Sequence, residues 1–327
     1  DFDRKPQHIS SLSTYIRWIK LMFKSILVPL DGSHLAEAGL PAAASLAEKL
    51  NAPVTLLHII EQNAPEAVHH ERHLTKPQEA EAYLQELARQ FFSAEVKATW
   101  HVHSAQVKDV PASIVEHTGE FDPGLIVMCA HGRSGIRDML FGRIAQQVIA
   151  KGSTPLLLLQ PMTSQQKPFN LRRILLPLVS ESTHDDSLPI AKILAKAYGA
   201  ELSLLCVIPT FSTLRGDEAA TSTILPATTN ALLDIKEEHA KEHLQGHLNE
   251  LASEGFHVSA EVARGDPTQT IVNVAEQGKA DLIVLSTHRR AGIDAFWARS
   301  VAPNVARRTR IPLLFIPLPP RTASAPG

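Results

Sequence analysis

The feature that most limits how this chain can fold is that its sequence repeats itself once. Residues 23–60, FKSILVPLDGSHLAEAGLPAAASLAEKLNAPVTLLHII, match residues 171–208, LRRILLPLVSESTHDDSLPIAKILAKAYGAELSLLCVI. Residues 124–159 match residues 281–316 in the same way. Solenoid repeats are much shorter, about 20–50 residues each, so units of this length are duplicated domains. The sequence therefore predicts two copies of one domain.

The two copies differ in length in their middle. Ile26 corresponds to Ile174, an offset of 148, whereas His131 corresponds to His288, an offset of 157. The second copy therefore holds nine additional residues. We expect them within residues 209–235.

With 327 residues, the chain has the length of two domains of about 150 residues each. The stretch DFDRKPQHISSLSTYIRWIKL at its start has no long apolar core and no small-residue cleavage site. We interpret it as a leader or added segment; the alternative is a short native helix that packs on the first domain. We predict a leader or added segment over residues 1–21, a first domain over 22–163, a second domain over 170–320 and a tail over 321–327.

Each copy alternates continuous apolar runs with helical patterns. Runs without in–out alternation are typical of strands covered on both faces, which occur in parallel sheets flanked by helices. Right-handed crossovers then give a doubly wound, five-stranded, Rossmann-like α/β domain in each copy. In the first copy we expect strands at 25–30, 54–60, 96–102, 125–128 and 156–159, and helices from residue 33 onward, near 77–93, at 109–119 and at 139–151.

Ligands of doubly wound sheets bind beyond the carboxyl ends of the strands. The loops at Asp31, Ile60 and Cys129 all lie at that edge of the predicted first sheet. Ser33 is placed to cap the helix that follows the first loop. That helix is expected from apolar positions three or four residues apart, namely Leu35, Gly39, Ala42, Leu46 and Leu50.

Glycines and arginines follow the fourth strand, in the stretch VMCAHGRSGIRDMLFGRIAQQVI of residues 127–149. A glycine has no Cβ, so its backbone N–H can approach a phosphate and its φ can be positive. The following helix adds unpaired N–H donors and the positive end of its dipole. Arg133 and Arg137 make the loop cationic. The stretch predicts an anion site; the alternative is a tight turn with a rim of solvated arginines.

Both copies resemble universal stress protein domains. The resemblance rests on an Asp after the first strand, Asp31, and on a loop of the form G-x-x-G-x(9)-G-[S/T] after the fourth. Nine residues separate Gly132 from Gly142, as that loop requires. Two positions depart from it, because Cys129 replaces the first glycine and Arg143 replaces the Ser or Thr. The Arg143 guanidinium either contacts phosphate or fills the space that phosphate would occupy.

The resemblance covers residues 23–318 and implies an adenine nucleotide alpha hydrolase-like fold whose fifth strands pair across a dimer. Here the two copies would form an intramolecular pseudo-dimer, with a homodimer as a further assembly. It also implies ATP, or the related AMP or ADP, with adenosine at the Asp, phosphates in the glycine loop and Mg²⁺ beside them. The expected nucleotide-binding residues are Pro29, Leu30, Asp31, Ile59, Met128, Cys129, His131, Gly132, Gly142, Arg143 and Ile144.

The second copy departs further from the pattern. Val179 replaces the Asp, and an apolar side chain cannot accept a hydrogen bond from a ribose. Arg289 and Arg299 replace the two loop glycines, whereas Ser300 is retained. We therefore expect nucleotide binding in the first copy and a degenerate site in the second.

Composition excludes several classes of protein. A net charge of −2 and a pI near 6.8 argue against a general nucleic-acid binder, which is usually basic. No apolar run approaches the roughly 20 residues that span a membrane. Two cysteines, Cys129 and Cys206, form no disulfide framework, which favours a cytoplasmic protein.

Other patterns are weaker. HAKEH at residues 239–243 fits H-x-x-E-H and could bind a metal, but its charged neighbours are typical of a solvated helix face. HHERH, residues 69–73, is expected at the surface. His131 and His288 either orient their loops or contact phosphate. GRSG at residues 132–135 lacks the G-x-S-x-G spacing of a nucleophile elbow, so no catalytic residue is predicted.

These observations predict a stress-response regulatory module that binds ATP or a related adenine nucleotide in its first domain. One alternative is an interaction or scaffold protein of the same fold that works without nucleotide. The other is a slow ATPase or autophosphorylating enzyme.

Overall fold

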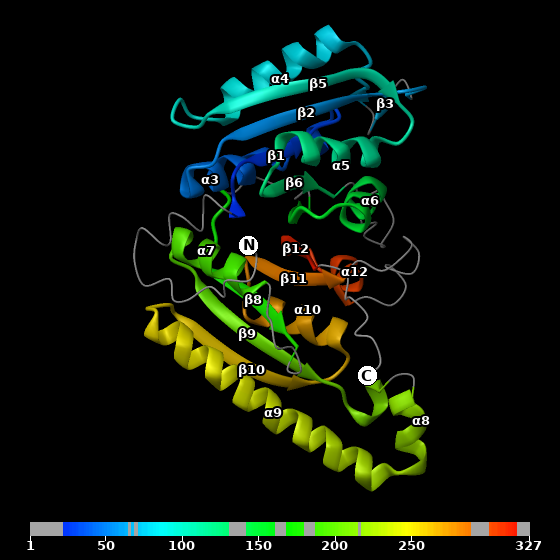
Figure 1. Cartoon of the computed structure of the whole chain (residues 1–327), viewed down its shortest axis with the longest axis vertical. Helices are drawn as coiled ribbons and strands as arrows, with labels where there is room; N and C mark the ends of the chain where they lie inside the picture. The colour runs from blue at the N-terminus through cyan, green and yellow to red at the C-terminus, as the bar shows by residue number, and fades with distance from the viewer. Residues whose placement is uncertain are drawn as a thin grey trace, which may run out of the picture. The chain divides into compact units, whose positions relative to one another are not determined.

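The computed structural model describes residues 22–64, 67–68, 71–130, 142–160, 168–179, 187–214, 217–288 and 301–318. These residues form the predicted α/β architecture of parallel sheets and helices (Figure 1). The chain separates into two compact units. The first unit joins Ile19–Asn170 to the last segment, Ser286–Gly327, and the described residues of the second unit lie within Leu171–Leu285.

The sheet of the first unit has the strand order β12-β7-β6-β1-β2-β5. Its central strand, β1, pairs in parallel with β2 and β6 because Ile26 lies opposite both Val54 and Leu125. The side chains of β1, β6 and β7 are almost all buried, which explains their continuous apolar sequences. The strands are β1 (Ile26–Pro29), β2 (Val54–Glu61), β5 (Ala98–Val107), β6 (Leu125–Cys129), β7 (Leu156–Leu159) and β12 (Leu313–Leu318).

The fifth strand of each copy contributes to this sheet. β12 runs antiparallel to β7, and Leu313 lies opposite Leu158. The Gln160 side chain strengthens the contact, because its Nε2 donates to the carbonyls of Ala306 and Thr309 at 3.3 and 3.1 Å. The last strand of the second copy therefore extends the sheet of the first unit.

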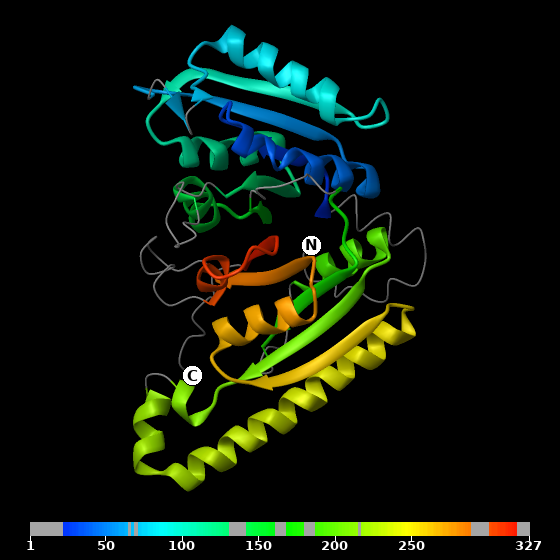
Figure 2. The same ribbon diagram turned by 180° about the vertical axis from the view of Figure 1, so that it is seen from behind.

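The helices of the first unit are α2 (His34–Glu37), α3 (Leu40–Leu50), α4 (Pro77–Phe91), α5 (Val110–Phe121), α6 (Arg143–Lys151) and α12 (Val301–Ala306). Within the unit, α4 packs along β5 and β2, as Figure 2 shows from behind. A short hairpin of β3 (Ala67–Val68) and β4 (Glu71–Arg72) precedes α4.

The first helix differs from its prediction, because the structure divides it into two. Ser33 caps α2 as expected, and its Oγ accepts from the Ala36 N–H at 3.2 Å. The helix then stops at Glu37, and α3 begins three residues later with Pro41 in its first turn. A proline has no N–H, and its ring clashes with the carbonyl four residues before it, here that of Glu37. Pro41 therefore begins a new helix rather than continuing α2.

The third strand also differs from its prediction. β5 begins at Ala98 and extends to Val107, five residues beyond the predicted end at Val102. It is the edge strand of the sheet, so much of its surface is exposed and its later residues are polar. The helix predicted at 139–151 is observed as α6 from Arg143, and residues 131–141 lie outside the described part of the chain.

The second unit repeats the pattern with the order β10-β9-β8-β11. Its strands are β8 (Arg173–Leu178), β9 (Glu201–Ile208), β10 (Val258–Arg264) and β11 (Leu282–His288), the last of which continues past Leu285. Its helices are α7 (Leu188–Tyr198), α8 (Asp217–Ile224), α9 (Pro226–Ser253) and α10 (Pro267–Gln277), with a 3₁₀ turn at Phe211–Thr213.

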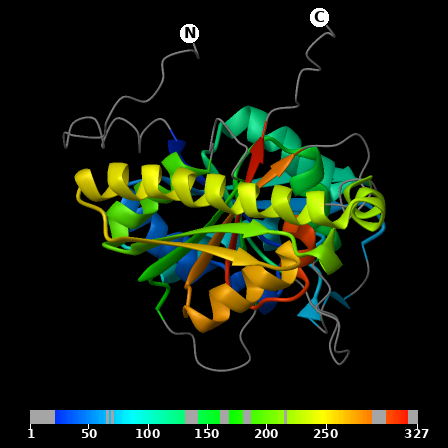
Figure 3. The ribbon, with the colours of Figure 1, turned by 90° about the horizontal axis from the view of Figure 1, so that it is seen from below.

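The additional residues of the second copy form helix. α9 has 28 residues where α4 has 15, and α8 precedes it. α4 begins at Pro77 and α9 at Pro226, an offset of 149, so most of the additional residues lie within α9, which extends beyond the predicted range of 209–235. Figure 3 shows α9 running along β10, which it contacts together with β9.

Candidate functional site

A cavity of about 660 Å³ lies at the carboxyl edge of the sheet in the first unit. Its wall is built from the ends of β1, β2, β5 and β6 and from the first turns of α5 and α6. The strands run in parallel, so their last residues meet at one edge. The lining residues are Pro29, Leu30, Asp31, Ala36, Leu57, Ile59, Glu61, His73, Lys108, Asp109, Val110, Pro111, Ile114, Met128, Cys129, Gly142, Arg143, Ile144, Ala145 and Gln147.

The cavity brings together most of the residues that the sequence singled out. Two of the predicted residues, His131 and Gly132, lie outside the described part of the chain, as do Arg133 and Arg137. The others line the cavity, namely Pro29, Leu30, Asp31, Ile59, Met128, Cys129, Gly142, Arg143 and Ile144.

Asp31 is held in a tight turn beside the cavity. Its Oδ1 accepts hydrogen bonds from the Ser33 backbone N–H at 3.0 Å and from the Ser33 hydroxyl at 2.6 Å. Gly32 makes this turn with a φ of 89°, and a Cβ added there would lie 2.9 Å from the Leu74 Cγ. Only glycine adopts this conformation without strain. The turn thus fixes a carboxylate where β1 ends.

His58 holds the same turn through contacts of its ring with two backbone carbonyls. Its Nδ1 lies 2.8 Å from the Leu30 carbonyl, and its Nε2 lies 3.0 Å from the Leu74 carbonyl. The ring is buried. It therefore links the end of β1 to the segment before α4.

The N-terminus of α6 opens on the cavity. Gly142 is its N-cap residue, and no side chain caps the helix within the described part of the chain. The first N–H groups of a helix have no partner inside it, and the helix dipole is positive at this end. Gly142, Arg143, Ile144 and Ala145 all line the cavity. The arrangement suits an anion.

Arg143 is one of the residues that line the cavity. It is exposed, while the cavity beside it still measures about 660 Å³. Both roles considered for Arg143, contact with phosphate and filling of the phosphate space, stay predictions.

The end of the third strand supplies residues that the sequence analysis missed. Lys108 and Asp109 follow β5 and line the cavity. Asp109 caps α5, because its Oδ1 accepts from the Ala112 N–H at 3.0 Å, and its Oδ2 lies 2.6 Å from the Lys151 Nζ. The Lys151 hydrogen bond, followed by that of Ala112, lowers the pKa of Asp109. Both residues were identifiable, because every parallel strand ends at this edge of the sheet.

His73 is a further lining residue that sequence reasoning assigned to the surface. The side chain is 6% exposed, and its Nδ1 has no hydrogen-bond partner among the described residues. Burial lowers its pKa, so the neutral ring is favoured. A buried polar atom without a partner is rare in proteins, and a ligand is one way of satisfying it. His69 and His70 of the same motif lie outside the described part of the chain.

Cys129 contributes a small neutral wall. Burial, followed by the nearby Asp31 carboxylate, raises the pKa of the Cys129 thiol to about 12. A thiol protonated at neutral pH is a poor nucleophile. Both cysteines, Cys129 and Cys206, are buried and free of disulfides.

The corresponding edge of the second unit differs. Val179, which occupies the position of Asp31, is 67% exposed. Arg289, Arg290, Arg299 and Ser300 lie outside the described residues, as does the side chain of His288. Both copies keep an aspartate that caps the helix after the third strand. Asp266 caps α10 by accepting from the Gln269 N–H at 3.0 Å, as Asp109 caps α5.

The HAKEH pattern lies on the charged face of α9. His239 is exposed, and Lys241 forms ion pairs with Glu237 at 3.0 Å and Glu238 at 2.7 Å. Within the described part of the chain, no third ligand joins His239 and His243 at metal-binding distance. His239 and its charged neighbours agree with the predicted solvated helix face, whereas His243 is half-buried and its ring lies against that of His247, with 4.7 Å between the centroids.

None of the helices that the structure describes is both long and apolar enough to span a membrane.

The family model of the "Universal stress protein family" matches residues 22–160 and again residues 170–317. Two curated relatives come from Methanocaldococcus jannaschii. Universal stress protein MJ0531 is 26% identical over 156 residues, which cover 46% of this chain and 89% of that protein. Universal stress protein MJ0577 is 27% identical over 153 residues, which cover 44% of this chain and 94% of that protein. Among solved structures, a universal stress protein from Archaeoglobus fulgidus superposes with a TM-score of 0.63 at 18% identity, covering 90% of this chain and 96% of that one.

Proposed function

The chain belongs to the universal stress protein family, and from this we propose that its first unit binds ATP or a related adenine nucleotide as a regulatory module of the stress response. The cavity at the carboxyl edge of the first sheet is the observation that carries the proposal. Its volume of about 660 Å³ lies within the range of roughly 300–1,000 Å³ typical of small-molecule sites.

One part of the cavity suits a purine base and its ribose. The apolar side chains of Leu57, Ile59, Ile114 and Met128 line it, and they offer an apolar surface against which a base can pack. Asp31 stands beside them and is placed to accept from ribose hydroxyls or the adenine amine. A carboxylate cannot donate, so this contact favours a ligand group that carries hydrogen.

The other part suits phosphate. The uncapped N-terminus of α6 provides backbone N–H donors, and the cations Lys108 and Arg143 stand at the rim. Mg²⁺ would enter with the phosphates and reduce their charge beside the carboxylates of Asp31 and Glu61, which also line the cavity. The apolar part of the cavity thus suits the base of a nucleotide, and its cationic part suits the phosphates.

Calorimetric titration of the purified full chain with ATP, ADP, AMP and cyclic AMP, each with and without Mg²⁺, tests the proposal. We expect saturable binding of at least one of these nucleotides at one site per chain. No heat from any of them would instead support the interaction module that works without nucleotide. The buried thiols suit a reducing cytoplasm as the site of that function.

An enzyme is the less supported alternative. The described lining residues include no activated nucleophile, since the Cys129 thiol is protonated at neutral pH. Mass spectrometry of the small molecule released on denaturation separates the two functions. Intact ATP supports a binding module, whereas ADP or a phosphorylated chain supports slow hydrolysis or autophosphorylation.

A further inference from the structure

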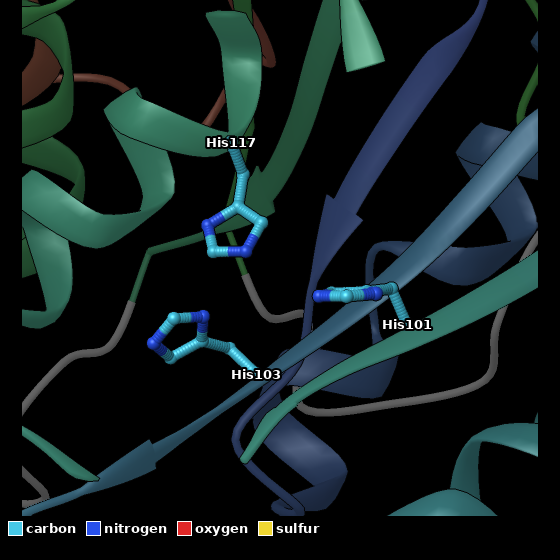
Figure 4. A group of neighbouring side chains, drawn as sticks. All are labelled: His101, His103 and His117. Carbon is cyan, nitrogen blue, oxygen red and sulfur yellow. The ribbon is translucent and has the colours of Figure 1, made fainter. Parts of the chain in front are cut away.

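Three histidines that are not among the lining residues of the nucleotide cavity converge between the edge strand and a helix of the first unit. His101 and His103 lie two residues apart on β5, so their side chains leave the same face of the strand. His117 reaches them from α5. Figure 4 shows the three rings turned toward a common point. One ring nitrogen from each lies within 4.8 Å of those of the other two.

We propose that His101, His103 and His117 form a site for a divalent transition metal of the zinc class. Imidazole nitrogen is a preferred ligand of Zn²⁺, and three histidines with one open position are a known zinc ligand set. Zn–N bonds of about 2.0–2.1 Å require ligand nitrogens roughly 3.4 Å apart in a tetrahedral site. Metal binding therefore requires the three nitrogens to move closer together from separations of up to 4.8 Å.

The hydrogen bond of His117 prepares it to be a ligand. Its Nδ1 lies 2.7 Å from the Ser113 carbonyl oxygen, which can only accept, so Nδ1 carries the proton. The Nε2 lone pair is therefore available to a metal. Metal-binding histidines commonly donate their second N–H to a backbone carbonyl, which fixes both tautomer and ring orientation.

The cluster is partly shielded from solvent, and imidazole binds a metal in its neutral form. His117 is 4% exposed, and the other two are half-buried. Three protonated rings this close would repel one another.

The site has a potential fourth ligand. The Glu120 Oε2 lies 3.9 Å from the His117 Nε2, and its side chain is 59% exposed. It stands one helical turn from His117, so it can rotate toward a metal or leave the fourth position to water.

Packing alone does not account for the three imidazoles. Phe121 contacts two of the rings, at centroid distances of 5.3 Å from His101 and 5.8 Å from His117. In the second copy, the positions offset by 157 are Val258, Ala260 and Val274. The same strand and helix therefore form there without any of the three histidines.

Zinc titration of the chelator-treated full chain tests the proposal, with bound metal counted by elemental analysis. We expect one Zn²⁺ per chain at this site and a higher melting temperature on binding. Co²⁺ used as a probe should give the visible absorption of a tetrahedral nitrogen site. His103→Gln should weaken Zn²⁺ binding at least tenfold and abolish the Co²⁺ spectrum.

His103→Gln is the variant of choice, because His103 is half-buried on an edge strand and Phe121 packs against the other two rings. His243→Gln on α9 is the matched control, since it removes a histidine outside the cluster, and it should leave both readings unchanged. The proposal is overturned if the native chain binds no Zn²⁺, or if His103→Gln binds it as tightly as the native chain does.

Discussion

The two copies of the domain share their strand-and-helix order but differ in the chemistry at the carboxyl edge of the first strand. In the first copy this edge carries Asp31 in a glycine turn beside a cavity. In the second copy it carries an exposed valine, Val179. Both copies keep the aspartate that caps the helix after the third strand, Asp109 and Asp266. Residues that build the fold occur in both copies, whereas the carboxylate suited to a nucleotide occurs in one.

The copies also differ in how they are stabilised. The second unit contains a buried ion pair, in which the Lys192 Nζ lies 2.7 Å from the Glu254 Oε1. The two side chains are only 10% and 4% exposed. Ala44 occupies the position of Lys192 in the first copy, at an offset of 148, so the first unit forms no equivalent pair with it.

The largest effect is expected from breaking that pair. Lys192→Ala leaves the Glu254 carboxylate buried without its cation, which should lower the free energy of unfolding by about 3–5 kcal/mol. Chemical denaturation measures the change. The double variant Lys192→Met/Glu254→Leu should recover most of the loss, because it removes both buried charges. A loss below 1 kcal/mol for the single variant would show that the pair contributes little to the second unit.

The next effect concerns the aspartate that distinguishes the copies. Asp31→Asn keeps an oxygen for the Ser33 turn but removes the charge, so nucleotide binding should weaken by about 10- to 100-fold, as for the loss of a charged hydrogen bond. Calorimetry measures the change in Kd. Val179→Ala is the control at the matching position and should have no effect. Equal affinities of the native chain, Asp31→Asn and Val179→Ala would show that Asp31 does not contact the nucleotide.

The next prediction compares the effect on stability of replacing a glycine in a turn, Gly32, with that of replacing a glycine in a helix, Gly246. Gly32→Ala should destabilise the chain by about 1–3 kcal/mol, because the turn needs a positive φ and the Leu74 side chain is 2.9 Å from the new Cβ. Gly246→Ala, in α9 with no atom within 4 Å of its Cβ position, should stabilise by up to about 1 kcal/mol. Thermal unfolding gives both signs. Stabilisation by both changes would contradict the strained turn.

The smallest effect is a dependence on pH that resides in the first unit. Burial is the largest influence on the pKa of His73 and lowers it. The nearby Glu61 and Asp31 carboxylates raise this pKa, and His58 lowers it further. The unfolded chain therefore binds the proton first as pH falls below about 6.5. Stability should decrease from pH 7 toward pH 5, and His73→Gln should reduce that slope. An unchanged slope in the variant would assign the dependence to other groups.

Much of the fold could be predicted from the sequence. Strands β1, β2, β6 and β7 agree with prediction to within a residue or two, because they are covered on both faces and read as continuous apolar runs. β5 is an edge strand, so its polar second half carries no such signal. The break between α2 and α3 was missed because the apolar spacing continues through Pro41.

The candidate site was predictable in part for the same reason. Asp31, Ile59 and Met128 stand where apolar runs end, and parallel strands bring such ends together. His73 reaches the cavity from the segment before α4, and Ile114 reaches it from within α5. Their approach depends on how α4 and α5 pack, which no local pattern records. The histidine cluster was missed for a similar reason, because His117 belongs to α5 and meets the two residues of β5 only through the packing of helix on strand.

A crystal structure of the full chain with ATP and Mg²⁺ tests the central claim most directly. The account predicts one nucleotide in the cavity of the first unit, with its sugar or base against Asp31 and its phosphates at the N–H groups that begin α6. Nucleotide bound only in the second unit, or a cavity left empty at saturating ATP, would contradict it.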